Sequence, residues 1–286
     1  MNRRTFLAAV LGTPALAALI VACGDDSSSS SNYDFQESPD EVVVRISYEG
    51  GFVGPGALFS TVPTLLLTGD GRSFTPGAVP AIYPGPLLSP MFERSVTKQG
   101  IEKVLKLADD AGLLGEIPDY EMPDGPVVMD ASDTVVVINV NGKTYRHAAN
   151  ALGMGLPDDN TGGDTGARPE VTPARENLLT FVTLMGDLAK VAGAGNVGDD
   201  GNWVPDEYRF QAMAVDPAQW TDPSPTIVDW PAATGVVLAD SAQCAKVAAT
   251  EVDELFAGAT QLTFFQEDDL VYQLFVVGVL PGDAAC

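Results

Sequence analysis

Few residues in this chain have the type and spacing that chemistry requires. The only histidine, His147, follows Tyr145 and Arg146 at the end of a segment with the pattern of a β-strand. An imidazole can serve as a general base near neutral pH, but a lone histidine is more often a hydrogen-bonded structural residue. Motifs for a serine nucleophile elbow, for a zinc-binding His-Glu-x-x-His helix and for a phosphate-binding loop are all missing. The sequence therefore offers none of these catalytic templates.

Oxygen-bearing side chains give the only metal candidates. Asp158, Asn160 and Asp164 are spaced two and four residues apart in the segment 153–172, which has no periodicity. This spacing partly resembles the start of a calcium loop. Glu170 stands one residue too late for the bidentate ligand that closes such a loop. The run 199–202, Asp-Asp-Gly-Asn, is a second fragment of the same kind. Calcium is thus the one cofactor that the sequence suggests, and an ordinary polar loop is the alternative at both places.

The charge balance restricts the partners. The 286 residues include 15 Lys and Arg against 39 Asp and Glu, for a formal net charge of -24. Such a field repels nucleic-acid phosphates and anionic headgroups, so we expect no nucleic-acid partner. One histidine and three cysteines also exclude most zinc sites. The many carboxylates leave a hydrolase open, although Glu49, Asp70 and Arg72 stand beside glycine turns and are more simply solvated turn residues.

The N-terminus reads as an export signal. Arg3 and Arg4 precede an apolar run over 6–22, which is shorter than the roughly 20 residues that span a bilayer. We therefore expect a signal peptide over 1–22, with a short uncleaved anchor as the alternative. Residues 20–23, Ile-Val-Ala-Cys, resemble the bacterial lipobox, and Arg-Arg-x-Phe-Leu resembles the twin-arginine signal. The resemblance implies lipidation of Cys23 and anchoring on the extracytoplasmic face of the membrane.

Export also bears on the residues after Cys23. The polar run 24–32, Gly-Asp-Asp-Ser-Ser-Ser-Ser-Ser-Asn, cannot bury apolar surface, so we expect a lipidated flexible tether over 23–40. An oxidising compartment favours a disulfide between the two remaining cysteines, Cys244 and Cys286. Closing that loop would stabilise the fold by roughly 4 kcal/mol in the chain-entropy picture. Two free thiols are the alternative.

Hydrophobic periodicity predicts an α+β fold with mostly antiparallel sheets and amphipathic helices. We divide it into a first domain over 41–195 and a second unit over 196–286. In the first, the pattern predicts strands over 42–48 and 64–68, helices over 101–108 and 173–185, and a hairpin over 134–148. In the second, it predicts strands over 208–215 and 236–239, a helix over 250–257 and a hairpin over 262–279.

Three details refine this prediction. The proline-rich run 74–86 is unsuited to a central strand, and Thr250 is the expected N-cap of the last helix. Each half places a helix before a hairpin, and the apolar helix positions share an offset of 151 residues, which suggests two related strand-helix-hairpin units. Trp203, Trp220 and Trp230 lie in a proline-rich stretch, where they form either a binding face or the packing of the second sheet.

Two resemblances rest on particular residues. The run Val42–Gly54, together with Gly69–Arg72, Tyr83–Pro86 and Ala111–Leu114, is similar to a family of uncharacterised bacterial twin-arginine-exported lipoproteins. The order strand, Gly-Gly-Phe-x-Gly, strand, helix, hairpin, helix resembles the emfourins, small metalloprotease-inhibitor domains, over about the first half of the chain. This chain differs from them by its proline-rich insert and its long loop.

These observations favour a membrane-anchored binding module. The emfourin resemblance implies that Gly50, Gly51 and Phe52 contact an extracellular protein partner, with protease inhibition as one form of binding. The alternative from another class is an extracytoplasmic hydrolase that uses carboxylates and calcium.

Overall fold

The computed structural model describes residues 33–286 except 55, 123–127, 129, 154–170 and 285. The described residues form one compact unit that contains two sheets and four α-helices. Most neighbouring strands are antiparallel, so the predicted α+β class is confirmed. Among these residues no helix combines the length and apolarity needed to cross a bilayer.

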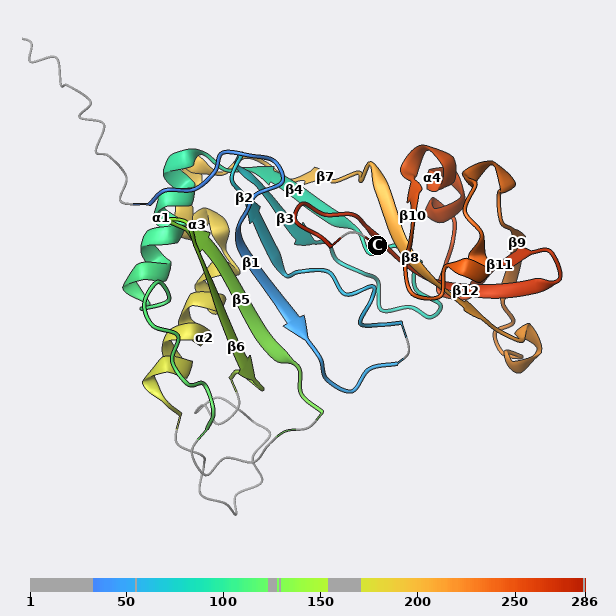
Figure 1. Cartoon of the computed structure of the whole chain (residues 1–286), viewed down its shortest axis with the longest axis horizontal. Helices are drawn as coiled ribbons and strands as arrows, with labels where there is room; N and C mark the ends of the chain where they lie inside the picture. The colour runs from blue at the N-terminus through green and yellow to red at the C-terminus, as the bar shows by residue number, and fades with distance from the viewer. Residues whose placement is uncertain (1–32, 55, 123–127, 129, 154–170, 285) are drawn as a thin grey trace, which may run out of the picture. The chain divides into compact units, whose positions relative to one another are not determined.

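The first sheet has seven strands in the order β6-β5-β1-β2-β3-β4-β7, and all of its neighbours are antiparallel (Figure 1). Its strands are β1 (Val42–Glu49), β2 (Leu65–Thr68), β3 (Arg72–Pro76), β4 (Met91–Ser95), β5 (Asp133–Val140), β6 (Lys143–Asn150) and β7 (Gly201–Asn202). The predicted strands over 42–48 and 64–68 and the predicted hairpin are confirmed. The prediction for the proline-rich run is wrong at its start, because β3 lies inside the sheet and ends at the first proline.

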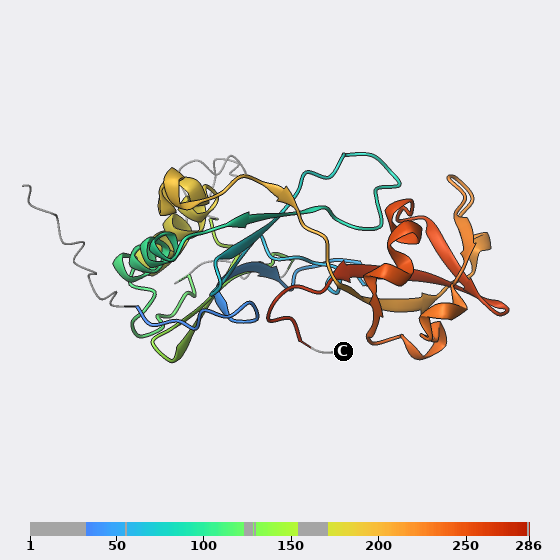
Figure 2. The same cartoon turned by 90° about the horizontal axis from the view of Figure 1, so that it is seen from above.

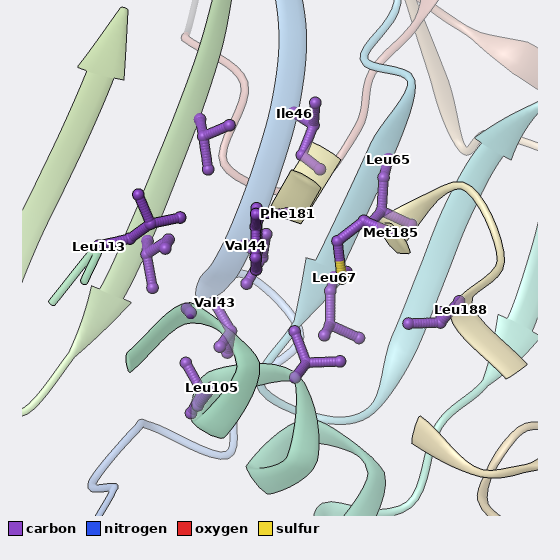
Figure 3. Packing of buried hydrophobic residues seen from close by; sticks show 14 of the residues in the cluster. Val43, Val44, Ile46, Leu65, Leu67, Leu105, Leu113, Phe181, Met185 and Leu188 are labelled. Carbon is purple, nitrogen blue, oxygen red and sulfur yellow. The ribbon is translucent and has the colours of Figure 1, made fainter. Parts of the chain in front are cut away.

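Helices α1 (Lys98–Asp110), α2 (Pro173–Met185) and α3 (Leu188–Ala192) cover one face of this sheet (Figure 2). Thr97 caps α1 by accepting a hydrogen bond from the Gly100 amide at 3.2 Å. Thr172 caps α2 by accepting a hydrogen bond from the Arg175 amide at 3.4 Å. Figure 3 shows the resulting core, in which side chains from these helices pack against β1 and β2. Because the sheet is buried on this face, its strands are held in one register.

The second sheet has five strands in the order β10-β8-β12-β11-β9. Its elements are β8 (Glu207–Ala214), β9 (Thr226–Asp229), β10 (Ala245–Ala248), α4 (Ala249–Ala257), β11 (Thr263–Glu267) and β12 (Leu270–Gly278). The predicted strand over 236–239 is wrong, since Leu238–Asp240 is a 3₁₀ turn. The predicted cap, Thr250, is also wrong, because the N-cap residue of α4 is Ala248, whose side chain has no atom that can accept a hydrogen bond from the helix. Strand β9 lies in the proline-rich stretch that contains the tryptophans, and it pairs in parallel with β11.

The two halves do not repeat one pairing scheme. In the first sheet, β1 pairs with the first strand of the hairpin, β5, whereas in the second, β8 pairs with the second strand, β12. The first sheet also extends past residue 195, because β7 pairs with β4. The chain then returns to the first sheet, where Leu280 joins a cluster with Leu66 and Phe74.

The segment before β1 is attached to the fold. Asp34 and Asn141 exchange hydrogen bonds, at 2.8 Å from the Asp34 amide and 2.7 Å from the Asn141 amide. Tyr33 and Phe35 pack against the core of the first sheet. Within the expected tether over 23–40, residues 33–35 therefore contact the fold, and their two aromatic side chains supply apolar contacts that the polar run 24–32 lacks.

Candidate binding site

The loop after β1 presents an exposed aromatic residue. Gly50 and Gly51 have φ values of +71° and +84°, which L-residues rarely adopt. A Cβ on Gly51 would lie 3.3 Å from the Ser132 amide nitrogen, so the loop passes close to the chain before β5. The Phe52 amide donates to the Asp130 carbonyl at 3.3 Å, while its side chain is 88% exposed. The backbone of this loop is thus held in place, and Phe52 is free for contact.

A groove of about 470 Å³ adjoins this loop. It is formed by β1, by the segment 58–63, by β8 and by the C-terminal segment 282–284. The lining residues are Arg45, Ser47, Tyr48, Glu49, Gly50, Leu58, Thr61, Val62, Pro63, Arg209, Gly282, Asp283 and Ala284. Its volume is in the range of small-ligand sites, and Gly50 of the loop is one of its lining residues.

An ion cluster forms one wall of the groove. The Asp283 side chain is only 3% exposed, and its Oδ1 accepts from Arg45 Nη1 at 2.9 Å. Its Oδ2 accepts from the Leu280 amide at 3.1 Å and lies 3.6 Å from Arg209 Nε. The Arg209 guanidinium also stacks over the Phe59 ring at 5.1 Å. The C-terminal segment is therefore fixed to both sheets through one carboxylate.

Glu49, the other acid of the groove, is already engaged. Its Oε2 accepts from Arg146 Nη2 at 2.7 Å, and its Oε1 accepts from Ser47 Oγ at 3.4 Å. Asp70 and Arg72 form a separate turn contact at 2.8 Å, as expected for solvated turn residues. None of these acids is held in a pair that would suit general acid-base chemistry.

His147 is a structural residue. It is fully buried on β6, and its Nε2 lies 2.9 Å from the Leu113 carbonyl, which can only accept. Nε2 therefore carries the proton, and Nδ1 accepts from the Tyr120 hydroxyl at 2.7 Å. Burial lowers the pKa of His147, and it raises the pKa of Tyr120 to about 12. With both nitrogens engaged and no lining role in the groove, the imidazole is not placed to act as a general base.

The metal candidates gain no support. Asp158, Asn160 and Asp164 lie outside the described residues. In the second fragment, Asp200 pairs with Arg94, with Nη2 and Oδ2 2.5 Å apart, and Gly201–Asn202 is β7. Within the described ranges, no three His, Cys, Asp or Glu side chains are grouped to hold a metal ion.

The tryptophans serve packing. Trp230 is buried among the aromatic rings of the second core, and its Nε1 donates to the Val236 carbonyl at 2.9 Å. Trp203 stacks edge-on with Phe74 at 5.6 Å, and Trp220 with Phe264 at 5.0 Å. Packing against the second sheet is thus supported for Trp220 and Trp230, whereas Trp203 packs against the first sheet.

Sequence reasoning missed two patterns. Gly193, Gly195 and Gly198 have the spacing of a dinucleotide-binding motif, but they follow α3 and precede β7, whereas that motif links a strand to a helix. The cluster of Arg45, Arg209 and Asp283 was also missed, because 238 positions separate its ends and only the fold unites them.

Cys244 and Cys286 are within disulfide distance, with Cα atoms 5.2 Å apart. Arg3, Arg4 and Cys23 lie outside the described residues. No family model, curated protein or solved structure matches the chain. The case for function therefore rests on the groove and its loop.

Proposed function

We propose that the chain is a membrane-anchored extracytoplasmic lipoprotein whose folded part binds a protein partner through the Phe52 loop. The observation that carries this proposal is the exposure of Phe52 on a loop whose backbone is fixed. An exposed aromatic ring on the same loop region as the exposed side chains of Tyr48 and Leu58 offers apolar area for contact with a partner. A preformed loop also loses little conformational entropy on binding.

The direction of β1 supports the same proposal. The segment that leads to the expected anchor meets the fold near Asn141, at the Val42 end of β1. The Phe52 loop follows the other end, at Glu49. At about 3.3 Å per residue, seven steps along the strand separate these ends by roughly 23 Å. The described segment that precedes β1 therefore joins the fold at the end of the strand opposite the binding loop.

Protease inhibition is the specific form of binding that the sequence resemblance suggests. An inhibitor must present a side chain on a rigid segment that resists rearrangement, and the two left-handed glycines with the Phe52 amide bond provide such a segment. The groove beside the loop would accept further residues of the partner. The disulfide pair fits an oxidising compartment, where extracellular proteases act.

The proposal is tested by in-cell photo-cross-linking. A photoreactive phenylalanine analogue is placed at position 52 and, as a control, at Tyr83, which is 67% exposed on a different loop. We expect a discrete protein adduct from position 52 alone, and the purified adduct partner should bind the wild-type chain but not Phe52→Ser. Equal adducts from both positions, or undiminished binding by Phe52→Ser, would refute the proposal.

A further inference from the structure

Two arginines on the wall of the groove share one buried carboxylate. Arg45 and Arg209 share a single carboxylate, Asp283, and the remaining lining acid, Glu49, is engaged by Arg146. The cluster of Arg45, Arg209 and Asp283 thus carries one positive charge, while Glu49 is offset by Arg146, which does not line the groove. In a chain with a net charge of -24, a local surplus of this sign is unexpected for a merely solvated surface.

Several N–H groups of these two arginines make no hydrogen bond within the described ranges. Arg209, whose side chain is 19% exposed, makes no side-chain hydrogen bond within the described ranges, because its buried Nε lies 3.6 Å from Asp283 Oδ2, an ion pair too long for a hydrogen bond. Arg45 uses Nη1 for Asp283, and no bond from its Nε or Nη2 is found in the same ranges. A guanidinium has five N–H donors, and burial without acceptors is unfavourable for a charged group. The Nη groups of Arg209 and the Nε and Nη2 groups of Arg45 are therefore the donors that an acceptor from outside would engage.

We propose that this groove binds a carboxylate group of the partner polypeptide. Arg209 would bind it through its fork of N–H donors, since a planar carboxylate matches the geometry of a guanidinium, and Arg45 would add a second contact. Tyr48 and Leu58, which are exposed and line the groove, would contact the apolar atoms next to the carboxylate. This inference rests on the proposed function, because it specifies the chemistry of the partner.

Small probes separate the two sources of a carboxylate. N-acetylphenylalanine has the free carboxylate of a chain end beside an apolar ring, and N-acetylphenylalaninamide differs from it only by the amide. N-acetylaspartate N-methylamide carries the carboxylate of an acidic side chain. Binding of each probe to the full-length protein in detergent is measured by ligand-observed saturation-transfer NMR, which detects weak ligands of large complexes.

We expect at least one of the two carboxylate probes to bind about tenfold more tightly than the amide, the factor expected for a charge-assisted hydrogen bond. The tighter of the two identifies a chain end or a side chain as the source. Arg209→Gln should weaken that binding about tenfold. Arg94→Gln is the matched control, because it removes one positive charge from β4 at a residue that does not line the groove, and it should leave the affinity unchanged.

Three results would overturn the inference. They are binding of the amide as tight as that of both carboxylate probes, no saturable binding of either carboxylate probe, and an equal loss of affinity in Arg209→Gln and Arg94→Gln. If Arg209→Gln unfolds on melting analysis, Arg209→Lys replaces it, because it keeps the charge and removes the fork, and full affinity in that variant would also overturn the inference. The position-52 cross-link is a separate readout. A specific adduct there without carboxylate binding would refute this inference and leave the proposed function standing.

Discussion

The buried histidine makes stability depend on pH in a direction that can be worked out. In the unfolded chain the imidazole titrates near pH 6.5, whereas burial lowers the pKa of His147 in the fold, with the Leu113 carbonyl bond opposing part of that shift. Below pH 6.5 the unfolded chain therefore binds a proton that the folded chain excludes. Acid then favours unfolding, by up to about 1.4 kcal/mol per pH unit, until the pH reaches the folded-state pKa.

The matched variant is His147→Gln, which cannot titrate. At neutral pH it loses at least one of the bonds to Tyr120 and Leu113, and a buried group left without its partner costs about 1–3 kcal/mol. For a unit of this size that loss corresponds to a melting temperature lower by roughly 2–12 °C. At pH 7.5 we therefore expect the wild type to be clearly the more stable protein.

The assay is urea unfolding of both proteins from pH 7.5 to 5.0. The carboxylates of this acidic chain titrate in both proteins, so the difference between the two curves isolates the histidine. We expect that difference to shrink as the pH falls below 6.5. Parallel curves, or a difference that grows in acid, would show that His147 is not held neutral by burial and would refute the reasoning.

Two further predictions concern the C-terminal wall and the anchor. Asp283→Asn keeps an acceptor for the Leu280 amide but removes the charge between Arg45 and Arg209. We expect the free energy of unfolding to fall by about 2–3 kcal/mol. This is less than the loss for a fully buried pair, because the side chains of Arg45 and Arg209 are 25% and 19% exposed. Asp200→Asn, which breaks an exposed pair, should cost less than about 1 kcal/mol, and equal losses would contradict the assigned role. Cys23→Ser should release the chain from the membrane fraction, whereas a variant that is still processed and membrane-bound would rule out lipidation there.

Local patterns were enough to predict the elements that carry their own signals. Asn141 and Gly142 take the positive φ values of a two-residue hairpin turn, and the β-branched strands on either side pair as that turn requires. The caps of α1 and α2 are formed by adjacent side chains. Such signals lie within a few residues of the structure that they specify.

Elements that depend on a distant partner gave no signal. Strand β9 is defined by its parallel pairing with β11, and β7 is two residues long and forms only against β4. The same holds for the site. Its loop could be predicted from two glycines and an aromatic residue, but the positions of Arg209 and Asp283 beside β1 depend on the return of the chain from the second sheet to the first.

The central claim is that a protein partner covers the Phe52 loop, and carbene footprinting tests it most directly. The photolabelling of Phe52 is compared between the purified chain and the chain on intact cells, with Tyr83 as the internal reference, because both side chains are exposed in the isolated fold. We predict that labelling of Phe52 falls several-fold on cells while that of Tyr83 is unchanged. Equal labelling of Phe52 in the two samples would contradict the account.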